Sequence, residues 1–224
     1  MNRKKDIIQK INDLSGSRSP YEVYCDWVKL MVLSLQNTCC PFPLYQNKTW
    51  ERREEEYIKT IQPYGEDGKV FVDMFGMLTE TLDDSISDVL GEIYMESGCG
   101  NKNTGQFFTP FHVSVLCASM NVQNMLLEIE QTGKIILNEP SCGGGGMIIA
   151  AAKVLKDRGV NYQHCMKVVA QDLDWKAVYM CYVQLSLLGV DAVVVQGNTL
   201  MDLDWKARPP ECIFRTPNRM GMLI

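Results

Sequence analysis

The stretch KIILNEPSCGGGGMIIAAAKVL, from Lys134 to Leu155, decides the fold of this chain. It starts with a short apolar run, passes through an acid–proline pair and four consecutive glycines, and continues as an alanine-rich apolar run. We expect a buried strand, a tight turn that no side chain crowds, and a helix whose first free N–H groups face that turn. Such a turn accepts a nucleotide-like ligand.

Strands and helices alternate after this turn. Apolar runs predict strands at residues 166–170, 192–195 and 211–214, with helices at 147–157 and 175–188. Such alternation argues for right-handed crossovers and a parallel sheet. We therefore predict an α/β fold with about four parallel strands, with the first strand central, and a ligand site outside the carboxyl ends of the strands.

The region before residue 98 has a different pattern, with apolar residues at helical spacing throughout. One helix is expected to start with Ser19 as its N-cap and Pro20 at its first position. Another, over residues 84–95, is expected to begin at Asp84 or Ser85. The sequence thus predicts an all-helical region over residues 1–98 and an α/β domain over residues 99–224.

Composition limits the possible functions. The 224 residues are 46% hydrophobic, enough for a sizeable core, and carry a net charge of −5, whereas a DNA-binding domain usually has a basic face. Nine cysteines follow no metal-like spacing, and no apolar run is long enough to span a membrane. We expect the chain to have no secretory leader. We expect a reduced, cytoplasmic protein whose contact with nucleic acid depends on a local patch or a partner.

The loop before the next helix contains two adjacent aromatic residues, Phe107 and Phe108, followed by Thr109 and Pro110. A helix start explains the threonine as N-cap and the proline as first helical residue. It does not explain the aromatic pair. The histidines His112 and His164 have no second ligand at a metal-like spacing, so packing or surface roles are favoured over metal binding for both.

Polar residues follow the predicted strands at the edge where a ligand would bind. Asp172 ends the second strand, and an acid there can accept both hydroxyl protons of a ribose. Asn198 follows the third strand and can both donate to and accept from an adenine edge, beside the apolar Leu200. With the glycine turn, these residues predict an adenosine-shaped pocket.

A dinucleotide such as NAD is the main competing ligand. Its fingerprint is G-x-G-x-x-G directly after a strand, whereas this chain has E-P-S-C-G-G-G-G. Glu139, just before the turn, would repel a pyrophosphate but would suit a cationic ligand such as the amine or sulfonium of S-adenosylmethionine. The sequence therefore favours S-adenosylmethionine.

These motifs resemble those of adenine-specific (N6) DNA methyltransferases, in particular the modification (M) subunits of type I restriction–modification systems. Residues 105–110 match the family's G-x-Y/F-Y/F-T-P motif, and residues 139–146 are similar to its D/N-P-A-C-G-S-G-G motif. Residues 171–174 resemble Q-E-I-N, residues 197–200 resemble G-D-T-L, and residues 88–94 resemble the segment that closes the helical region.

The resemblance implies a domain with a Rossmann-like methyltransferase sheet that binds S-adenosylmethionine. Compared with the family, this domain is expected to be short at its C-terminus. The resemblance also places Asp172 on the ribose and Asn198 near the adenine. The cofactor-binding residues that it implies are Gln106, Phe107, Phe108, Thr109, Pro110, Glu139, Ser141, Cys142, Gly143, Asp172, Leu173, Asn198, Thr199 and Leu200.

The family's catalytic N-P-P-F/Y motif is degenerate in this chain. Its position after the fourth strand holds Thr216, Pro217, Asn218 and Arg219, of which the first proline alone matches. The family's asparagine accepts hydrogen bonds from the target amine, and its aromatic residue stacks on the flipped adenine. Neither side chain is present in register, so we expect cofactor binding to persist better than catalysis.

Two functions follow from the resemblance. The first is methyl transfer to adenine in DNA, by this chain or by one completed by another chain. The alternative is a catalytically inactive cofactor-binding or regulatory module that docks on DNA-modification partners. In either case DNA would be reached through a partner subunit, and a second copy or a hetero-complex would cover the edge of the fourth strand.

Overall fold

The structure is a computed structural model and describes residues 2–39, 47–98, 107–201 and 204–221. The described residues of 1–81 and 93–106 form one compact part, called here the helical unit, and those of 82–92 and 107–224 form a second, the sheet unit. The segment Leu82–Glu92, which the sequence grouped with the helical region, therefore counts with the sheet unit.

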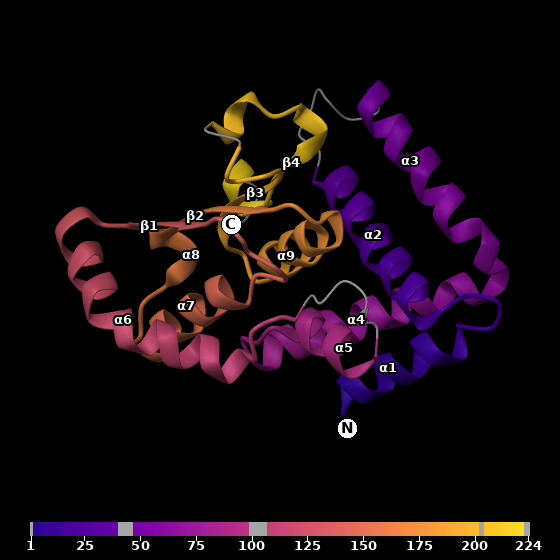
Figure 1. Cartoon of the computed structure of the whole chain (residues 1–224), viewed down its shortest axis with the longest axis horizontal. Coiled ribbons are helices and arrows are strands. Elements are labelled where there is room, and N and C mark those ends of the chain that lie inside the picture. Colours follow the sequence, from indigo (N-terminus) through magenta and orange to yellow (C-terminus); the bar gives the residue numbers. More distant parts are fainter. Residues whose placement is uncertain (1, 40–46, 99–106, 202–203, 222–224) are drawn as a thin grey trace. The chain divides into compact units, whose positions relative to one another are not determined.

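The helical unit is built from several helices (Figure 1), and their buried apolar residues form its core. Helix α2 starts with the predicted cap: Ser19 accepts a hydrogen bond from the Glu22 amide, and the Glu22 carboxylate accepts one from the Ser19 amide. In the core, the buried ring of Tyr24 contacts the buried rings of Trp27 and Tyr94. The elements that contribute to this unit are α1 (Arg3–Asp13), α2 (Pro20–Thr38), α3 (Lys48–Ile61), the 3-10 segment η1 (Gln62–Gly68), α4 (Lys69–Asp84) and α5 (Val89–Glu96).

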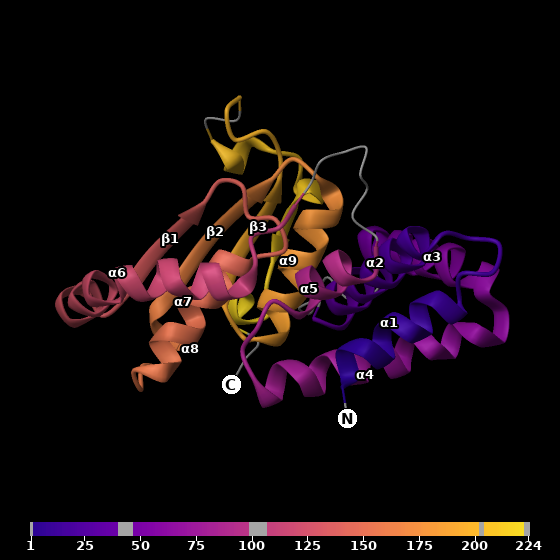
Figure 2. The same cartoon turned by 60° about the horizontal axis from the view of Figure 1, so that its bottom comes forward.

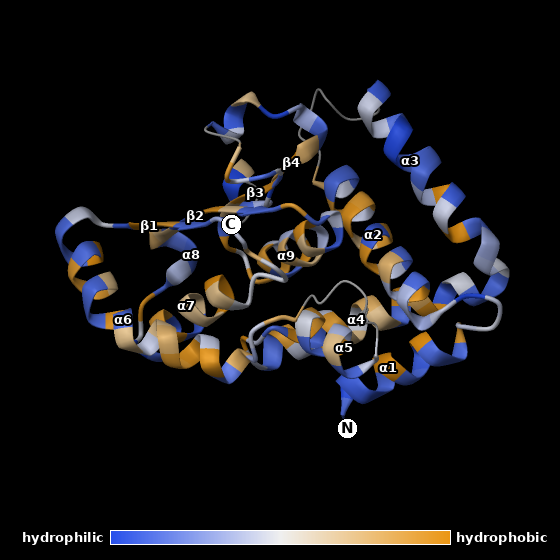
Figure 3. Cartoon of the chain, in the orientation of Figure 1, coloured by the Kyte–Doolittle hydropathy of each residue, from blue (hydrophilic) through white to orange (hydrophobic). Residues whose placement is uncertain are grey.

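Helix α3 is polar along most of its length (Figure 3) and contains no buried residue. It carries the mixed-charge run from Glu51 to Glu56. In this run Glu56 pairs with Lys29 of α2, and both side chains are partly exposed. This is the arrangement expected of a solvated helix face.

The entry to α5 lies later than the sequence indicated. Helix α4 continues through Asp84, and α5 begins at Val89 after a short extended segment. The Asp88 carboxylate accepts a hydrogen bond from the Gly91 amide at 3.0 Å, so Asp88, rather than Asp84 or Ser85, caps this helix. Similarly, α6 (Phe111–Thr132) has Pro110 as its N-cap residue, not Thr109.

The sheet unit contains a four-stranded sheet in the order β1-β2-β3-β4. Strands β1 (Ile135–Glu139), β2 (Met166–Asp172) and β3 (Asp191–Gln196) are parallel, with Glu139 opposite Ala170 and Asp172 opposite Gln196. Right-handed crossovers between strands that follow one another in order place the connecting helices on one face. Accordingly, α7 (Gly146–Asp157) and α9 (Trp175–Leu187) lie on the same side of the sheet (Figures 1 and 2).

The prediction of a wholly parallel sheet is wrong for the fourth strand. Strand β4 (Ile213–Arg215) runs antiparallel to β3, with Phe214 opposite Val194 and Arg215 opposite Val193. Because the strands are in sequential order, β1 is an edge strand and not the central one. The α/β class, the four strands and the helical N-terminal region are as expected, and the sheet is mixed.

The remaining elements of the sheet unit are short: α8 (Tyr162–Cys165), η2 (Trp205–Ala207), η3 (Pro210–Cys212) and η4 (Asn218–Met220). Its core combines the buried strands and α9 with a contact between α6 and α7, where Ala118 and Val122 pack against Ala150 and Val154. No helix in the described part of the chain has both the length and the apolar character needed to cross a bilayer.

Candidate cofactor site

The glycine turn between β1 and α7 has backbone geometry that side chains would obstruct. Gly143 and Gly145 have positive φ values of 51° and 94°, and Gly145 is the N-cap residue of α7. A Cβ on Gly143 would lie 2.9 Å from Cδ1 of Phe108, closer than real Cβ contacts come. The phenyl ring therefore packs directly against the turn, and glycine is needed for both the conformation and the contact.

Hydrogen bonds join this turn to the ends of the neighbouring strands. The Gly143 amide donates to Oδ2 of Asp172 at 2.9 Å, and the Cys142 amide donates to the carbonyl of Gln171 at 2.9 Å. The hydroxyl of Thr199 donates to the carbonyl of Pro140 at 2.7 Å. These hydrogen bonds connect the carboxyl ends of β1, β2 and β3.

A cavity of about 110 Å³ opens beside the turn, and all of its described lining residues belong to the sheet unit. Whole-ligand sites commonly measure about 300–1,000 Å³, so this cavity accommodates one end of a nucleoside ligand and not all of it. Its described lining residues are Asp88, Phe107, Phe108, Thr109, Ser114, Ser141, Cys142, Gly143, Gly144, Gly146 and Met147.

Five lining residues were not among the sequence-predicted site residues, and two of them, Asp88 and Ser114, have polar side chains; the others are Gly144, Gly146 and Met147. Asp88 Oδ1 accepts hydrogen bonds from the Gly91 amide and from Nε2 of Gln184, and the same Nε2 donates to the carbonyl of Gly144 at 2.8 Å. Desolvation by burial raises the pKa of the Asp88 carboxyl, although these hydrogen bonds oppose the shift. The sequence signal for Asp88 was its place in the motif-like segment 88–94, whereas Ser114 had none.

The structure brings together some of the predicted cofactor residues and leaves others outside the cavity. Phe107, Phe108, Thr109, Ser141, Cys142 and Gly143 are among its lining residues. The predicted residues that the described lining does not include are Pro110, Glu139, Asp172, Leu173, Asn198, Thr199 and Leu200. Gln106 lies outside the described residues.

Outside the cavity, the carboxyl ends of β1, β2 and β3 carry the predicted residues Glu139, Asp172 and Asn198. The Asp172 carboxylate is half-buried, and its Oδ1 also accepts from the Asp174 amide at 3.0 Å. Asn198 is exposed, its side-chain oxygen accepting from the Leu200 amide, and Leu200 is itself 90% exposed. Glu139 is half-buried, and its carboxylate accepts from the Ser141 amide at 3.3 Å.

Residues Thr216 to Arg219 lie at the opposite end of the sheet from this cavity. The buried Thr216 hydroxyl donates to the carbonyl of Val190 at 2.6 Å. Asn218 donates to the carbonyls of Gln163 and Gly189, which precede β2 and β3 respectively. Arg219 pairs with Asp191, the first residue of β3. The antiparallel direction of β4 is the cause, because it carries the chain away from the carboxyl ends of β1 to β3.

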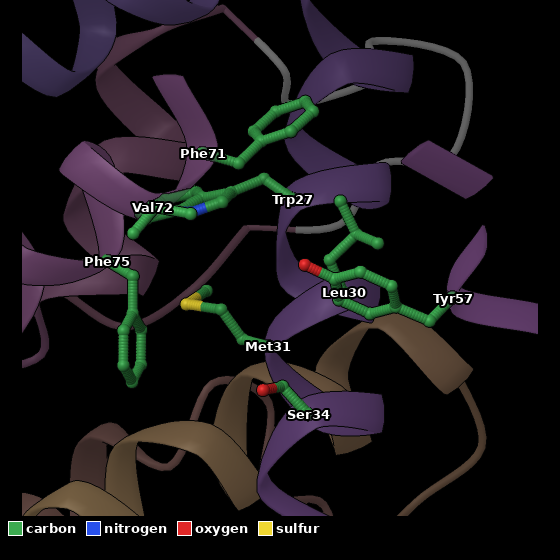
Figure 4. A pocket seen from close by; sticks show the side chains of 8 residues that line it. All are labelled: Trp27, Leu30, Met31, Ser34, Tyr57, Phe71, Val72 and Phe75. Carbon is green, nitrogen blue, oxygen red and sulfur yellow. The ribbon is translucent and has the colours of Figure 1, made fainter. Parts of the chain in front are cut away.

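Another cavity, of about 150 Å³, lies within the helical unit and differs in chemistry (Figure 4). Apolar and aromatic side chains of α2, α3 and α4 dominate its wall, among them Leu30, Met31, Tyr57 and Phe75. The cavity at the glycine turn is therefore the better candidate for a nucleoside ligand.

No group of three or more His, Cys, Asp or Glu side chains in the described ranges could hold a metal ion.

Comparison with known proteins agrees with this geometry. The family model described as N-6 DNA methylase matches residues 85–218, more than half of the chain. This chain belongs to the N-6 DNA methylase family.

Among solved structures, the chain is similar to a protein of Listeria monocytogenes assigned to the class I S-adenosylmethionine-dependent methyltransferases, with a TM-score of 0.49 and 13% sequence identity. The match covers 90% of this chain and 55% of that one, so this chain spans about half the length of its structural relative. No curated protein matches the sequence.

Proposed function

We propose that this chain binds S-adenosylmethionine at the carboxyl ends of β1, β2 and β3, as the cofactor-holding part of an adenine-N6 DNA methylation system of the type I restriction–modification kind. The observation that carries the proposal is the junction of Gly143 and Asp172. Gly143 lies in a turn where a Cβ would clash with Phe108. Its amide donates a 2.9 Å hydrogen bond to the carboxylate of Asp172 at the end of the next strand.

The residues at this junction suit the parts of the cofactor. The Asp172 carboxylate uses one lone pair on each oxygen for a backbone amide, and its remaining lone pairs can accept the ribose hydroxyls. Asn198 offers an amide for the adenine edge. Phe107, which is 76% exposed, and Phe108 supply apolar surface at the cavity wall. When bound, the cofactor would supply a sulfonium-activated methyl group.

Catalysis by residues Thr216 to Arg219 does not fit this arrangement. They lie at the amino end of β3, whereas the cofactor residues lie at its carboxyl end, about 17 Å away along six residues of strand. The buried Thr216 hydroxyl and the Asn218 amide are already used by backbone groups. This favours the alternative of a cofactor-binding module without methyl transfer of its own over the first function, a methyltransferase in which this segment acts.

Two measurements on the purified chain test the proposal together. Isothermal titration calorimetry with S-adenosylmethionine should give saturable 1:1 binding, and transfer of labelled methyl groups to unmethylated DNA should not exceed the protein-free background. Methyl transfer at a rate that Asn218→Ala abolishes would overturn the assignment of the Thr216 to Arg219 segment. Absence of binding would overturn the proposed function as a whole.

A partner is the proposed route to DNA. The net charge of −5 disfavours direct binding to a polyanion. We therefore infer that DNA contact comes from a partner subunit or a second copy, which would be cytoplasmic like this chain. We also infer that this partner covers an edge strand of the sheet, such as β4. Electrophoretic mobility shift with the chain alone should show no retarded DNA at 100 mM salt, a concentration of about the physiological order. A retarded band would contradict the inference.

A further inference from the structure

The cavity beside the glycine turn contains a buried acid. Asp88 is 3% exposed, and its burial raises the pKa of its carboxyl, with a smaller contribution in the same direction from the negative charge of Glu92. Among the described lining residues of the cavity, Asp88 alone carries a formal charge. A buried carboxylate without a cationic partner is costly, so a cation from a ligand would stabilise it.

The position of the second carboxylate oxygen points in the same direction. Oδ1 accepts the bonds from Gly91 and Gln184, whereas Oδ2 lies 3.0 Å from the place that a Cβ on Gly146 would occupy. Glycine at this position therefore leaves the acid in reach of the turn. Both described hydrogen bonds use Oδ1, and Oδ2 is the carboxylate oxygen nearer to Gly146 of the turn.

An unpaired hydroxyl lies on the same side of Gly146. Ser114 Oγ would be 3.7 Å from that same Cβ position, so the hydroxyl and Asp88 Oδ2 flank one glycine. Ser114 is fully buried, lines the cavity, and its Oγ has no hydrogen-bond partner. A buried hydroxyl left without a partner in the protein is an uncommon and costly feature, which a ligand can relieve.

We propose that Asp88 and Ser114 form the subsite for an aliphatic ammonium group, the amino end of the methionine moiety of S-adenosylmethionine. This inference rests on the proposed function and adds to it a specificity-determining pair of residues to which the sequence motifs gave no role. The small volume of the cavity fits this role, because it suits one end of the cofactor while Asp172 and Asn198 lie outside it at the nucleoside end.

The test compares three ligands by calorimetry on the whole chain. S-adenosylmethionine carries the ammonium, the carboxylate and the sulfonium, S-adenosylhomocysteine keeps the ammonium and the carboxylate but has no sulfonium, and 5′-methylthioadenosine has none of the three. We expect Asp88→Asn and Ser114→Ala each to weaken binding of the two ammonium ligands by about tenfold, the scale of one hydrogen bond to a charged group. Binding of 5′-methylthioadenosine should change by less than about twofold, within the uncertainty of a single uncoupled contact.

The variants are chosen so that the fold is retained. Asparagine keeps the oxygen that caps α5 and accepts from Gln184, and alanine removes a hydroxyl that bonds nothing in the protein. Ser119→Ala is the matched control, because Ser119 lies on the same helix, is exposed, and bonds the carbonyl of Val115. It should leave the binding of all three ligands unchanged.

The outcomes separate this inference from the proposed function. If the unmodified chain binds none of the three ligands, the proposed function falls and this subsite with it. If it binds S-adenosylmethionine but both variants bind all three ligands as tightly as before, or lose all three equally, the ammonium subsite alone is refuted.

Discussion

The carboxylate of Asp172 at the end of β2 accepts a 2.9 Å hydrogen bond from the backbone amide of Gly143 in the turn after β1. One side chain thereby fixes the distance between the glycine turn and the next strand end. Its second oxygen accepts from the Asp174 amide, which stabilises the start of α9.

Replacement of Asp172 should separate its structural part from its ligand part. We expect Asp172→Ala to lower the free energy of unfolding by about 1–3 kcal/mol, because the Gly143 and Asp174 amides lose a charged acceptor. The affinity for S-adenosylmethionine should also fall, and by more than the loss of folded protein would account for. Asp204→Ala, which removes an exposed cap from η2, is the control and should leave affinity unchanged in calorimetry.

Gly143→Ala should weaken cofactor binding through Phe108. A side chain at φ 51° costs about 1–2 kcal/mol of stability, and the new methyl group must displace the phenyl ring from 2.9 Å. Gly133→Ala provides the comparison, because Gly133 has a φ of 76° in the same unit with no atom within 4 Å of its Cβ position. Equal affinities for the two variants would show that contact with Phe108 plays no part in the site.

Asp88→Asn should stabilise the ligand-free protein at neutral pH. Burial raises the folded-state pKa of this carboxyl, so its contribution to stability is full below its unfolded pKa and is lost as pH rises through the folded pKa. The variant has no such loss. Its melting temperature should therefore exceed that of the parent at pH 7–8, with the difference shrinking towards about pH 4, near the ordinary pKa of aspartate. A difference of opposite sign, or one independent of pH, would contradict this account.

Thr216→Val should destabilise the chain without touching the cofactor site. The buried hydroxyl donates to Val190 and accepts from the Ala192 amide, so its loss leaves a buried amide without this acceptor, at a cost of about 1–3 kcal/mol. Urea denaturation measures the change, and Thr216→Ser, which keeps the hydroxyl, should recover most of it. If folded Thr216→Val loses S-adenosylmethionine affinity, the separation of the two sheet ends is refuted.

Local patterns in the sequence were sufficient for most of the sheet unit. The apolar runs predicted β2, β3, α7 and α9 to within two residues at each boundary. They succeeded because each element is long or strongly patterned and is buried on a face that its own residues define. The capped start of α2 at Ser19 was predictable for the same local reason.

The direction of β4 was not predictable in this way. It has three residues, and its apolar pattern is the same whether it runs parallel or antiparallel. The deciding contacts are distant in sequence: the Arg208 guanidinium donates to Gln196, and Thr216 bonds to Val190 and Ala192. No local pattern encodes which strand end these side chains will meet.

The cavity was only partly predictable for a similar reason. Phe108 and Gly143 belong to motifs and could be named from them. Asp88 and Ser114 come to the cavity through tertiary packing, and Ser114 is an ordinary polar residue on a mostly apolar helix. A sequence reading assigns such a residue to the solvent side until the packing partner of the helix is known.

The side-chain amide of Gln184 makes hydrogen bonds that indicate when the cavity forms during folding. It connects α9 to Gly144, 40 residues away, to Leu90, 94 residues away, and to Asp88, 96 residues away. Contacts of such sequence separation carry a large loop-closure cost and tend to form late. The ligand cavity should therefore be complete only when the chain has finished folding, which would make cofactor binding a sensitive reporter of incompletely folded molecules in any preparation.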